Sequence, residues 1–452
     1  MIQKKQHSLL NKAKEASDML KEHIEKDDIV RIISHNDADG ISSAAVLANA
    51  LAEENVQFHT TIVPRLKEEL VNQLRHEKYD LFIFSDMGSS FVKELNTYKS
   101  DVIIADHHQV SDVDSESNLV HINPHLFGID GSKDLSGAGS SYLAIRDLDK
   151  KHLAYYALIG AFGDMQGQYG FTGVNKLILD DSIESGKLDV HEGLKIVSKE
   201  TEPIFKSLAY TFSPPLPGIS GDLEGAREFL ERMNLSYGIK FTDLEDEEKD
   251  LLKNALMDIN PDIFGDCYTV PSEVPRLRDL EEYSYILDAC GKNKKQGLGL
   301  SIALGEKGPA LDTAVELQRQ YRDQIVKGLE WVKREGPVQL NNIQYLYSED
   351  KVLKSIMGTI ASIGLSVELI DESKPVLGLS RLHKDVKVSG RTTRPMVDKG
   401  VDLGKALHDS SNNFGGQGGG HDIAAGAMIP YEHMENFLHL VDEMVEYQLG
   451  SD

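Results

Sequence analysis

Residues 29–51, IVRIISHNDADGISSAAVLANAL, contain the clearest strand-turn-helix pattern in the first part of the chain. Residues 29–33 form a short apolar run that predicts a strand, and the alanine-rich residues 42–51 predict a helix suited to close packing. The polar turn between them carries His35, Asp37 and Asp39. A buried strand that runs directly into a helix is the repeating unit of an α/β fold.

The sequence on either side continues this alternation. A helix is predicted at about residues 4–25, and apolar runs at residues 56–62, 81–84 and 102–104 predict three more strands. Short apolar strands alternating with helices indicate a parallel sheet covered on both faces. Ligands of such sheets bind at the carboxyl ends of the strands, so the turns at these ends are the places to search for a site.

The remainder of the chain predicts a second domain. We expect a parallel-sheet domain at residues 1–200, a helical or irregular connecting region at 201–308, a linker helix at 309–336 and a smaller α/β domain at 337–452. Pro309 is favoured at a first helical turn, and the pair Gly336-Pro337 ends the helix. In the last region, strands are predicted at residues 343–347, 376–381 and 386–390, and helices at residues 402–409 and 431–447.

Composition restricts the possible partners. The formal net charge of −25 argues against nonspecific coating of nucleic acid, although a narrow channel remains compatible with it. Residues 374–405 run against this trend, with eight Lys or Arg and three Asp. The two cysteines, Cys267 and Cys290, are too few for a disulfide framework. Neither a signal peptide nor a membrane-spanning run is visible, so we expect a cytoplasmic protein without membrane contact.

Acidic residues and histidines follow three of the predicted strands and one apolar helix. SHNDADG follows the first strand, FSDMG places Asp86 after the third, and IIADHH places Asp106, His107 and His108 after the fourth. ALIGAFGDMQG places Asp164 after the helix. A lone Asp at such a position is commonly a helix N-cap, and a lone His pair often fills core or surface. Four such segments together favour a metal site instead.

The donor types suit phosphodiester chemistry. Two cations about 3.5–4 Å apart can activate a water and neutralise the charge on phosphorus. Carboxylates and imidazoles without thiolates suit Mn²⁺ or Mg²⁺, although affinity order also admits Co²⁺ or Zn²⁺. We therefore expect two divalent cations, with Mn²⁺ as the first choice and Mg²⁺ or Co²⁺ as alternatives.

The motifs resemble those of a known family. SHNDADG, FSDMG, ADHH and GAFGDMQ resemble, in order and spacing, the four motifs of the DHH phosphoesterase superfamily. FGGQGGGHDIAAG, near the C-terminus, resembles the GGGHxxAAG signature of the DHHA1 domain, and LRDLEEYSYILDACG resembles the archaeal RecJ-like nucleases that include a GINS-associated type. The resemblance implies that His35 and Asp37 bind one cation and that Asp39, His107 and Asp164 bind the other.

The same resemblance implies roles for the remaining motif residues. Asp86 would bridge the two cations, His108 would face the scissile phosphate, and Asp106 would orient the histidine pair. Hydrogen bonding of that kind fixes an imidazole tautomer. The alternative for Asp106 is that it is itself a ligand.

Two further segments are candidates for substrate binding. The glycine-rich segment before His421 reads as a loop whose amides can approach an anion, and a flexible linker is the alternative. Arg391 stands in an SGR setting that matches a DHHA1 pattern, and Arg suits bidentate phosphate contacts. The SGAG segment at residues 136–139 reads equally well as a helix entry. The candidate substrate-binding residues are Asn123, His125, Ser389, Arg391, Gly418, Gly419, Gly420 and His421.

These observations predict an exonuclease that cuts single-stranded DNA or RNA from an end and releases nucleoside monophosphates. One alternative is a phosphodiesterase for very short RNA or cyclic dinucleotides. Another is a replication scaffold with weak activity. Single-stranded nucleic acid and GINS-like replication proteins are the expected partners. Polarity and the choice between DNA and RNA depend on contacts that no motif reports.

Overall fold

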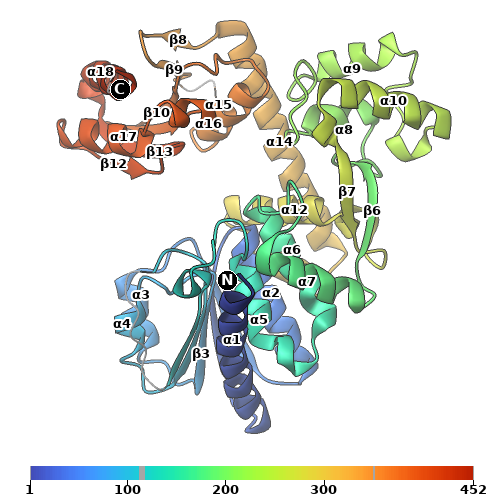
Figure 1. Cartoon of the computed structure of the whole chain (residues 1–452), viewed down its shortest axis with the longest axis vertical. Helices are drawn as coiled ribbons and strands as arrows, with labels where there is room; N and C mark the ends of the chain where they lie inside the picture. Colours follow the sequence, from blue (N-terminus) through green and yellow to red (C-terminus); the bar gives the residue numbers. More distant parts are fainter. Residues whose placement is uncertain (1, 111–117, 350–351, 451–452) are drawn as a thin grey trace. The chain divides into compact units, whose positions relative to one another are not determined.

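The computed structural model describes residues 2–110, 118–349 and 352–450. The chain forms two compact units (Figure 1). Unit 1 consists of Met1–Lys195 and Phe264–Arg319, and unit 2 consists of Ile196–Ile263 and Gln320–Asp452. The residues expected to connect the two domains therefore contribute to both units, because 201–263 fold with unit 2 and 264–308 fold with unit 1.

Unit 1 contains the predicted parallel sheet. All five strands are parallel, in the order β2-β1-β3-β4-β5, so their carboxyl ends share one edge. The strand β5 was not expected from the sequence. The strands are β1 (Val30–His35), β2 (Phe58–Val63), β3 (Leu81–Ser85), β4 (Asp101–Ala105) and β5 (Leu119–Ile122).

Helices cover both faces of this sheet (Figure 1). On one face, Ile32, Ile83 and Ile103 pack in a large core with α1, α2 and α5, and on the other, Phe82 and Phe84 pack with α3 and α4. Both faces are apolar, which explains why the strands read as continuous apolar runs. The helices are α1 (Ile2–Glu25), α2 (Ala38–Glu53), α3 (Glu68–Leu74), α4 (Val92–Leu95), α5 (Gly137–Ile145), α6 (Ala154–Gly163) and α7 (Gly173–Glu184).

The later part of unit 1 returns to the same core. Tyr283 and Leu287 of α12 are fully buried in the cluster that also holds α2 and α6. β6 and β7 form a separate two-stranded antiparallel sheet. The long helix α14 (Pro309–Glu335) begins in unit 1 and ends in unit 2. The other elements are β6 (Asp189–Leu194), β7 (Phe264–Thr269), α11 (Pro275–Arg278), α12 (Leu280–Lys292) and α13 (Gln296–Ala303).

Unit 2 contains a smaller mixed sheet, in the order β12-β13-β11-β10-β9-β8. Only β9 and β10 pair in parallel. The α/β fold with a parallel-sheet domain and a smaller C-terminal α/β domain is thus confirmed. The elements are β8 (Val338–Gln339), β9 (Gln344–Tyr347), α15 (Met357–Ser366), β10 (Val376–Leu382), β11 (Asp385–Arg391), α16 (Arg394–Asp398), α17 (Leu403–Asn412), β12 (Gln417–Gly420), β13 (Ala424–Pro430) and α18 (Met434–Leu449).

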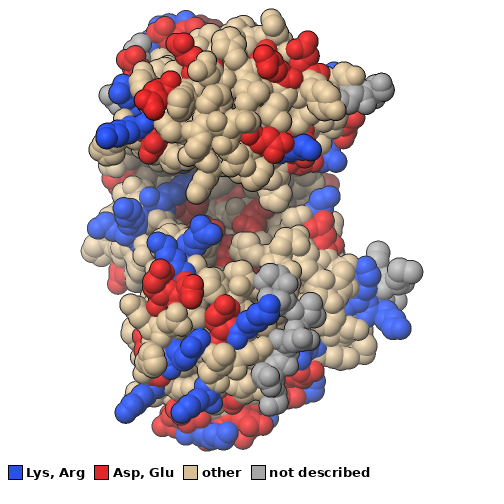
Figure 2. Space-filling model, turned by 90° about the vertical axis from the view of Figure 1, so that its left-hand side faces the viewer, with Lys and Arg blue, Asp and Glu red and all other residues tan. Residues whose placement is uncertain are grey.

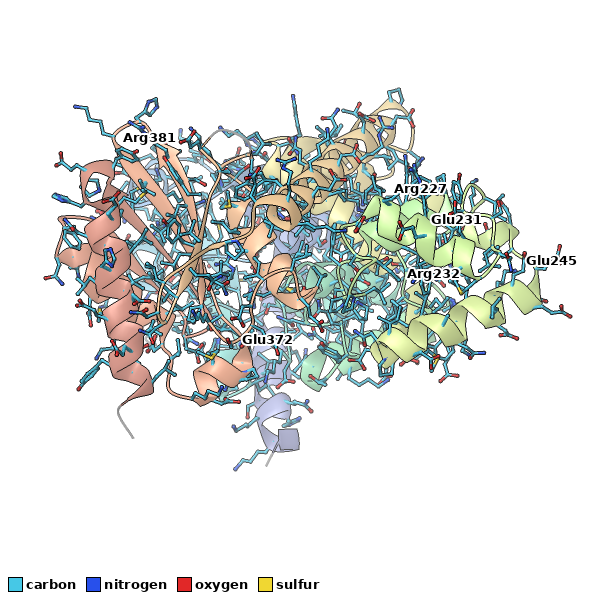
Figure 3. The ribbon with its side chains drawn as sticks, turned by 90° about the horizontal axis from the view of Figure 1, so that it is seen from above. Arg227, Glu231, Arg232, Glu245, Glu372 and Arg381 are labelled. Atoms are coloured by element: carbon cyan, nitrogen blue, oxygen red, sulfur yellow. The ribbon has the colours of Figure 1, made fainter. Side chains whose placement is uncertain are left out.

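Three helices precede α14 in unit 2: α8 (Ile204–Tyr210), α9 (Leu223–Arg232) and α10 (Asp246–Ile259). Arg227, which projects from α9 in Figure 3, lies 4.5 Å from the ring centroid of Phe205 on α8. Lys333 of α14 forms an ion pair with Asp222, the N-cap of α9. The first contact joins α9 to α8, and the ion pair joins the helical group to α14.

The glycine-rich segment predicted as a loop is instead an edge strand. β12 pairs with β13, with Gly418 opposite Ala427 and Gly420 opposite Ala425. A Cβ on Gly418 would lie 2.6 Å from the carbonyl oxygen of Leu407 in α17. Absence of side chains here lets α17 pack directly on the strand, so packing as well as anion approach explains these glycines.

Figure 2 shows a face on which basic and acidic side chains are interspersed, so neither sign covers it alone. Among the helices of the described residues, none combines the length and apolar character that a membrane span requires.

Candidate metal centre

The acidic and histidine-rich segments meet at the carboxyl edge of the unit 1 sheet. β1 ends at His35, and Asp86 directly follows β3. The DHH triplet follows β4, and Asp164 caps the carboxyl end of α6. Because β1, β3 and β4 are adjacent and parallel, their polar turns leave the sheet side by side.

Asp86 lies between two sets of donors. Its Oδ2 is 3.5 Å from His35 Nδ1, which is itself 2.7 Å from Asp37 Oδ2. Its Oδ1 is 3.4 Å from His107 Nε2, which is 3.2 Å from Asp164 Oδ2 and 3.7 Å from Asp39 Oδ2. The structure therefore brings the six predicted ligands into two groups that a single carboxylate joins.

The backbone conformation of Asp86 is unusual. Its φ is +55°, in the left-handed region, which Asp enters more readily than most side chains. Its amide donates to the carbonyl of Ala105 at 2.8 Å, which holds the turn. Here the turn directs a carboxylate that is 2% exposed into the cluster.

Both histidines of the cluster are held in the orientation of a metal ligand. His35 Nε2 lies 3.1 Å from the carbonyl of Pro64, and His107 Nδ1 lies 2.8 Å from the carbonyl of Gly131. A carbonyl only accepts, so each of these nitrogens carries the hydrogen, and a neutral ring then presents a lone pair to the carboxylates. Metal-bound histidines almost always donate their other nitrogen in this way.

The cluster also has atoms that protein groups leave unsatisfied. Within the described part of the chain, His35 Nδ1 and Asp86 Oδ1 are buried and have no hydrogen-bond partner. The 2.7 Å contact between His35 and Asp37 does not have hydrogen-bond geometry. An imidazole lone pair and a carboxylate oxygen this close can be neighbouring ligands of one cation, so the residues present fit divalent metal ions.

The buried charges of the cluster also favour bound cations. Burial raises the pKa of Asp39, and the charges of Asp86 and Asp164 raise it further. Burial raises the pKa of Asp164 to about 7. For Asp86, burial opposes ionisation, but the imidazoles of His107 and His35 outweigh it and lower the pKa. So many buried acids require protons or cations to balance their charge.

Asp106 positions its neighbours and is not free to coordinate. It is 1% exposed, and its Oδ1 accepts from the backbone N–H groups of His107 and His108 at 2.8 and 3.2 Å and from His108 Nδ1 at 2.7 Å. Its Oδ2 accepts from the amide of Ser89 at 2.9 Å. His108 consequently turns Nε2 away from Asp106, and its side chain is 55% exposed.

The segment SGAG is a helix entry that also supports the cluster. Ser136 is the N-cap of α5, and its hydroxyl accepts from the amide of Gly139. Asp39 accepts from the amides of Gly137 and Ala138 at 2.7 and 2.9 Å, so the first turn of α5 orients this carboxylate. A Cβ on Gly137 would lie 2.4 Å from Asp86 Oδ1. Only glycine permits this approach.

The predicted substrate residues of unit 1, Asn123 and His125, differ in burial. Asn123 is fully buried, and its amide donates to Ser89 Oγ at 2.8 Å and to the carbonyl of His108 at 2.9 Å. It can therefore hold the backbone of His108, but its burial does not fit direct substrate contact. His125 is half-buried beside Gly131 and, among the described residues, belongs to neither donor group.

The predicted substrate residues of unit 2 gather at one end of its sheet. Arg391 ends β11 opposite Ala424, whose carbonyl accepts from the amide of His421 at 2.9 Å. Arg391 Nε donates to Ser362 at 2.9 Å, and burial lowers the pKa of its guanidinium. Ser389 lies two residues earlier on the same strand face. Gly418, Gly419 and Gly420 belong to β12, which β13 separates from β11.

Several residues that build the centre were not identified from the sequence. They act through backbone groups, as the carbonyls of Pro64 and Gly131 do, or through the absence of a side chain, as Gly137 does. The type of a residue does not reveal whether its backbone carbonyl accepts a hydrogen bond from a histidine. The glycine content of the SGAG segment was the only sequence feature that indicated a close approach.

Comparison with known proteins places this geometry in a family. Residues 29–160 match the DHH family N-terminal domain, 196–260 the DHH-CID domain and 342–446 the DHHA1 domain. The uncharacterized protein MJ0831 of Methanocaldococcus jannaschii is 32% identical over 428 residues, which cover 93% of this chain and 94% of that protein. The chain belongs to the DHH/DHHA1 family. As a member with RecJ relatives, this DHH/DHHA1 protein is a phosphodiesterase hydrolase.

Two further proteins have structures that resemble the fold of this chain. The single-stranded-DNA-specific exonuclease RecJ of Thermus thermophilus is 24% identical over 238 residues, 48% of this DHH/DHHA1 chain and 34% of RecJ. The structure of that RecJ with Mn²⁺ has a TM-score of 0.59 at 17% identity and covers 96% of this chain and 55% of RecJ. CDC45 from Entamoeba histolytica has a TM-score of 0.69 at 11% identity, with 97% and 99% covered.

Proposed function

We propose that this DHH/DHHA1 protein is a divalent-metal-dependent exonuclease that hydrolyses single-stranded DNA or RNA from an end and releases nucleoside monophosphates. The observation that carries the proposal is the position of Asp86, whose two oxygens face two separate histidine-carboxylate groups. The likeness to RecJ supports a nuclease over other phosphodiesterases, because the RecJ of Thermus thermophilus acts on single-stranded DNA.

Each donor group would hold one cation. His35 and Asp37 would bind the first, and Asp39, His107 and Asp164 would bind the second, with Asp86 shared between them. Mn²⁺ is the proposed ion, because carboxylate and imidazole donors suit it and the related RecJ structure contains it. When bound, such a pair supplies an activated water and neutralises charge on the phosphorus.

The chain's own residues would orient the reaction. Asp106 holds His108 Nδ1, so His108 Nε2 is directed outward, where it can contact the scissile phosphate. Water forms a new bond to phosphorus and gives up a proton, the bond to the departing sugar oxygen breaks, and that oxygen takes up a proton and stays with the departing fragment. The side chains of Asp39 and Asp86 are 1% and 2% exposed. They are already packed in place, so binding of a cation would require no large rearrangement.

Unit 2 would bind phosphates of the same strand. Arg391 offers a guanidinium with which no carboxylate of residues 2–110, 118–349 or 352–450 pairs, and His421 is exposed at the same end of the sheet. A planar guanidinium suits the phosphate geometry. Ser389 and the amides of Gly418, Gly419 and Gly420 would complete this grip. A GINS-like partner and a cytoplasmic location remain predictions.

The test is a substrate series. End-labelled DNA and RNA strands of 2 and 20 nucleotides would be incubated with Mn²⁺ or Mg²⁺, and products would be separated by length. The proposal predicts stepwise shortening of the 20-mer and release of mononucleotides. Strong preference for the 2-mer would instead support a phosphodiesterase for very short oligonucleotides. Absence of any cleavage would support the scaffold alternative.

A further inference from the structure

A buried chain of hydrogen bonds leads to His107 from outside the six candidate ligands. The carbonyl of Gly131 accepts from His107 Nδ1 at 2.8 Å and also from Gln166 Nε2 at 3.0 Å. Gln166 Oε1 in turn accepts from Asn175 Nδ2 at 2.6 Å. Gln166 is 7% exposed and Asn175 is fully buried, so water does not compete freely for these bonds.

The direction of each bond follows from chemistry. The carbonyl of Gly131 can only accept, so both His107 Nδ1 and the Gln166 amide nitrogen donate to it. Asn175 donates to Gln166 Oε1, which sets the orientation of the Gln166 amide and leaves its NH₂ group facing Gly131. The carbonyl thus has both lone pairs occupied. This arrangement fixes the tautomer of His107 in which Nε2 faces the carboxylates.

The segment that carries Gly131 is fixed at both ends. The amides of Val174 and Asn175, in the first turn of α7, donate to the carbonyl of Asp134 at 2.9 and 2.8 Å. A Cβ on Gly131 would lie 2.4 Å from the carbonyl oxygen of His107, so the segment lies tightly against the DHH turn. A displacement of Gly131 would therefore be transmitted to His107.

We infer that Gln166, oriented by Asn175, is a positioning residue that prepares His107 to bind a divalent cation. Gln166 lies two residues after Asp164, so one short loop both supplies a carboxylate and directs the imidazole beside it. This inference rests on the proposed function, because it takes His107 as a metal ligand. It goes beyond it by assigning a role to two amide side chains that contact neither the cluster's carboxylates nor its imidazoles in any described bond.

The experiment measures Mn²⁺ affinity by isothermal titration at one fixed pH, without substrate. Gln166→Met keeps the length of the side chain but removes both hydrogen bonds, and we expect binding about 10–100-fold weaker. Asn175→Ala leaves Gln166 in place but frees its amide to turn, so a smaller loss is expected. Gln73→Met, on the exposed surface of α3, is the matched control and should bind as the wild type does.

A double-mutant cycle separates positioning from general damage. If Gln166 acts through His107, then Gln166→Met in a His107→Ala background should weaken binding by less than about twofold. Equal losses in both backgrounds would overturn the inference, as would wild-type affinity in Gln166→Met. Should Gln166→Met not fold, Asn175→Ala in both backgrounds gives the same test. Failure of the wild-type chain to bind Mn²⁺ would instead overturn the proposed function.

Discussion

The carboxyl edge of the unit 1 sheet and the glycine-rich end of the unit 2 sheet are built on opposite principles. At the first, charged side chains from separate strands converge, and backbone carbonyls and a helix N-terminus hold them. At the second, side chains are missing, so that α17 approaches the edge strand β12 closely. One region depends on donor atoms that must be present, and the other on space that must be kept.

This difference predicts different consequences of substitution. Removal of a donor at the unit 1 edge should abolish chemistry while the fold remains, because the strands themselves are apolar and intact. Addition of a methyl group at the unit 2 edge should disturb packing before it disturbs any contact with a ligand.

The largest effect is expected for Asp86→Ala. Both donor groups lose their shared carboxylate, so hydrolysis of a labelled single strand should fall by at least about 100-fold, or about 2.7 kcal/mol in the barrier. Asp18→Ala, on the exposed face of α1, is the control and should keep wild-type rates. Retention of more than about a tenth of the activity in Asp86→Ala would contradict a bridging role.

Gly137→Ala tests whether space also matters at the unit 1 edge. The new Cβ would lie 2.4 Å from Asp86 Oδ1, so the carboxylate must move, and activity should fall by at least about tenfold. Gly297→Ala, where a Cβ meets nothing within 4 Å, should leave the rate unchanged. Equal activity of the two variants would show that the position of Asp86 tolerates displacement.

Arg391→Met tests the grip assigned to unit 2. Loss of the guanidinium should raise KM for a 20-nucleotide strand by about tenfold and change kcat little, because ground-state and transition-state binding are weakened alike. Arg394→Met is the comparison, since Arg394 is 68% exposed and already lies near Asp398 and Asp422. If both variants behave alike, the guanidinium of Arg391 does not hold the substrate.

The last prediction concerns stability and not activity, and it tests the glycines of the β12–β13 hairpin. Gly418→Ala places a Cβ 2.6 Å from the Leu407 carbonyl and should destabilise unit 2 by about 1–3 kcal/mol. Gly426→Ala, on β13, meets only Val388 at 3.4 Å and should be neutral within about 0.5 kcal/mol. Urea unfolding can be followed through Trp331, the only tryptophan, which is buried in unit 2. Equal midpoints would refute the packing explanation.

The sequence predicted the unit 1 edge far better than the unit 2 edge. Apolar strands followed by Asp and His are visible in residue types, and the structure brings those side chains together. The strand β5 was missed because it has only four residues and one of them is His121. Consecutive glycines predict a loop, but these residues form β12. The neighbouring sequence does not distinguish a glycine in a flexible loop from a glycine that makes room for α17.

The groups that orient the candidate ligands and their neighbours could not be predicted from the sequence. Asn123 was expected to reach substrate, but its partners, Ser89 and the His108 carbonyl, become neighbours only in the folded chain. The Gly131 carbonyl that fixes His107 is equally invisible in residue types. Donor residues are therefore predictable from strand ends, whereas the groups that orient them require coordinates.

Anomalous diffraction from crystals soaked in Mn²⁺ tests the central claim most directly. Two manganese peaks should flank the Asp86 carboxylate, one beside His35 and Asp37 and one beside His107 and Asp164. Asp86→Ala crystals treated identically should show at most one. A wild-type cleft without manganese, or a single ion that Asp86 does not contact, would contradict the account.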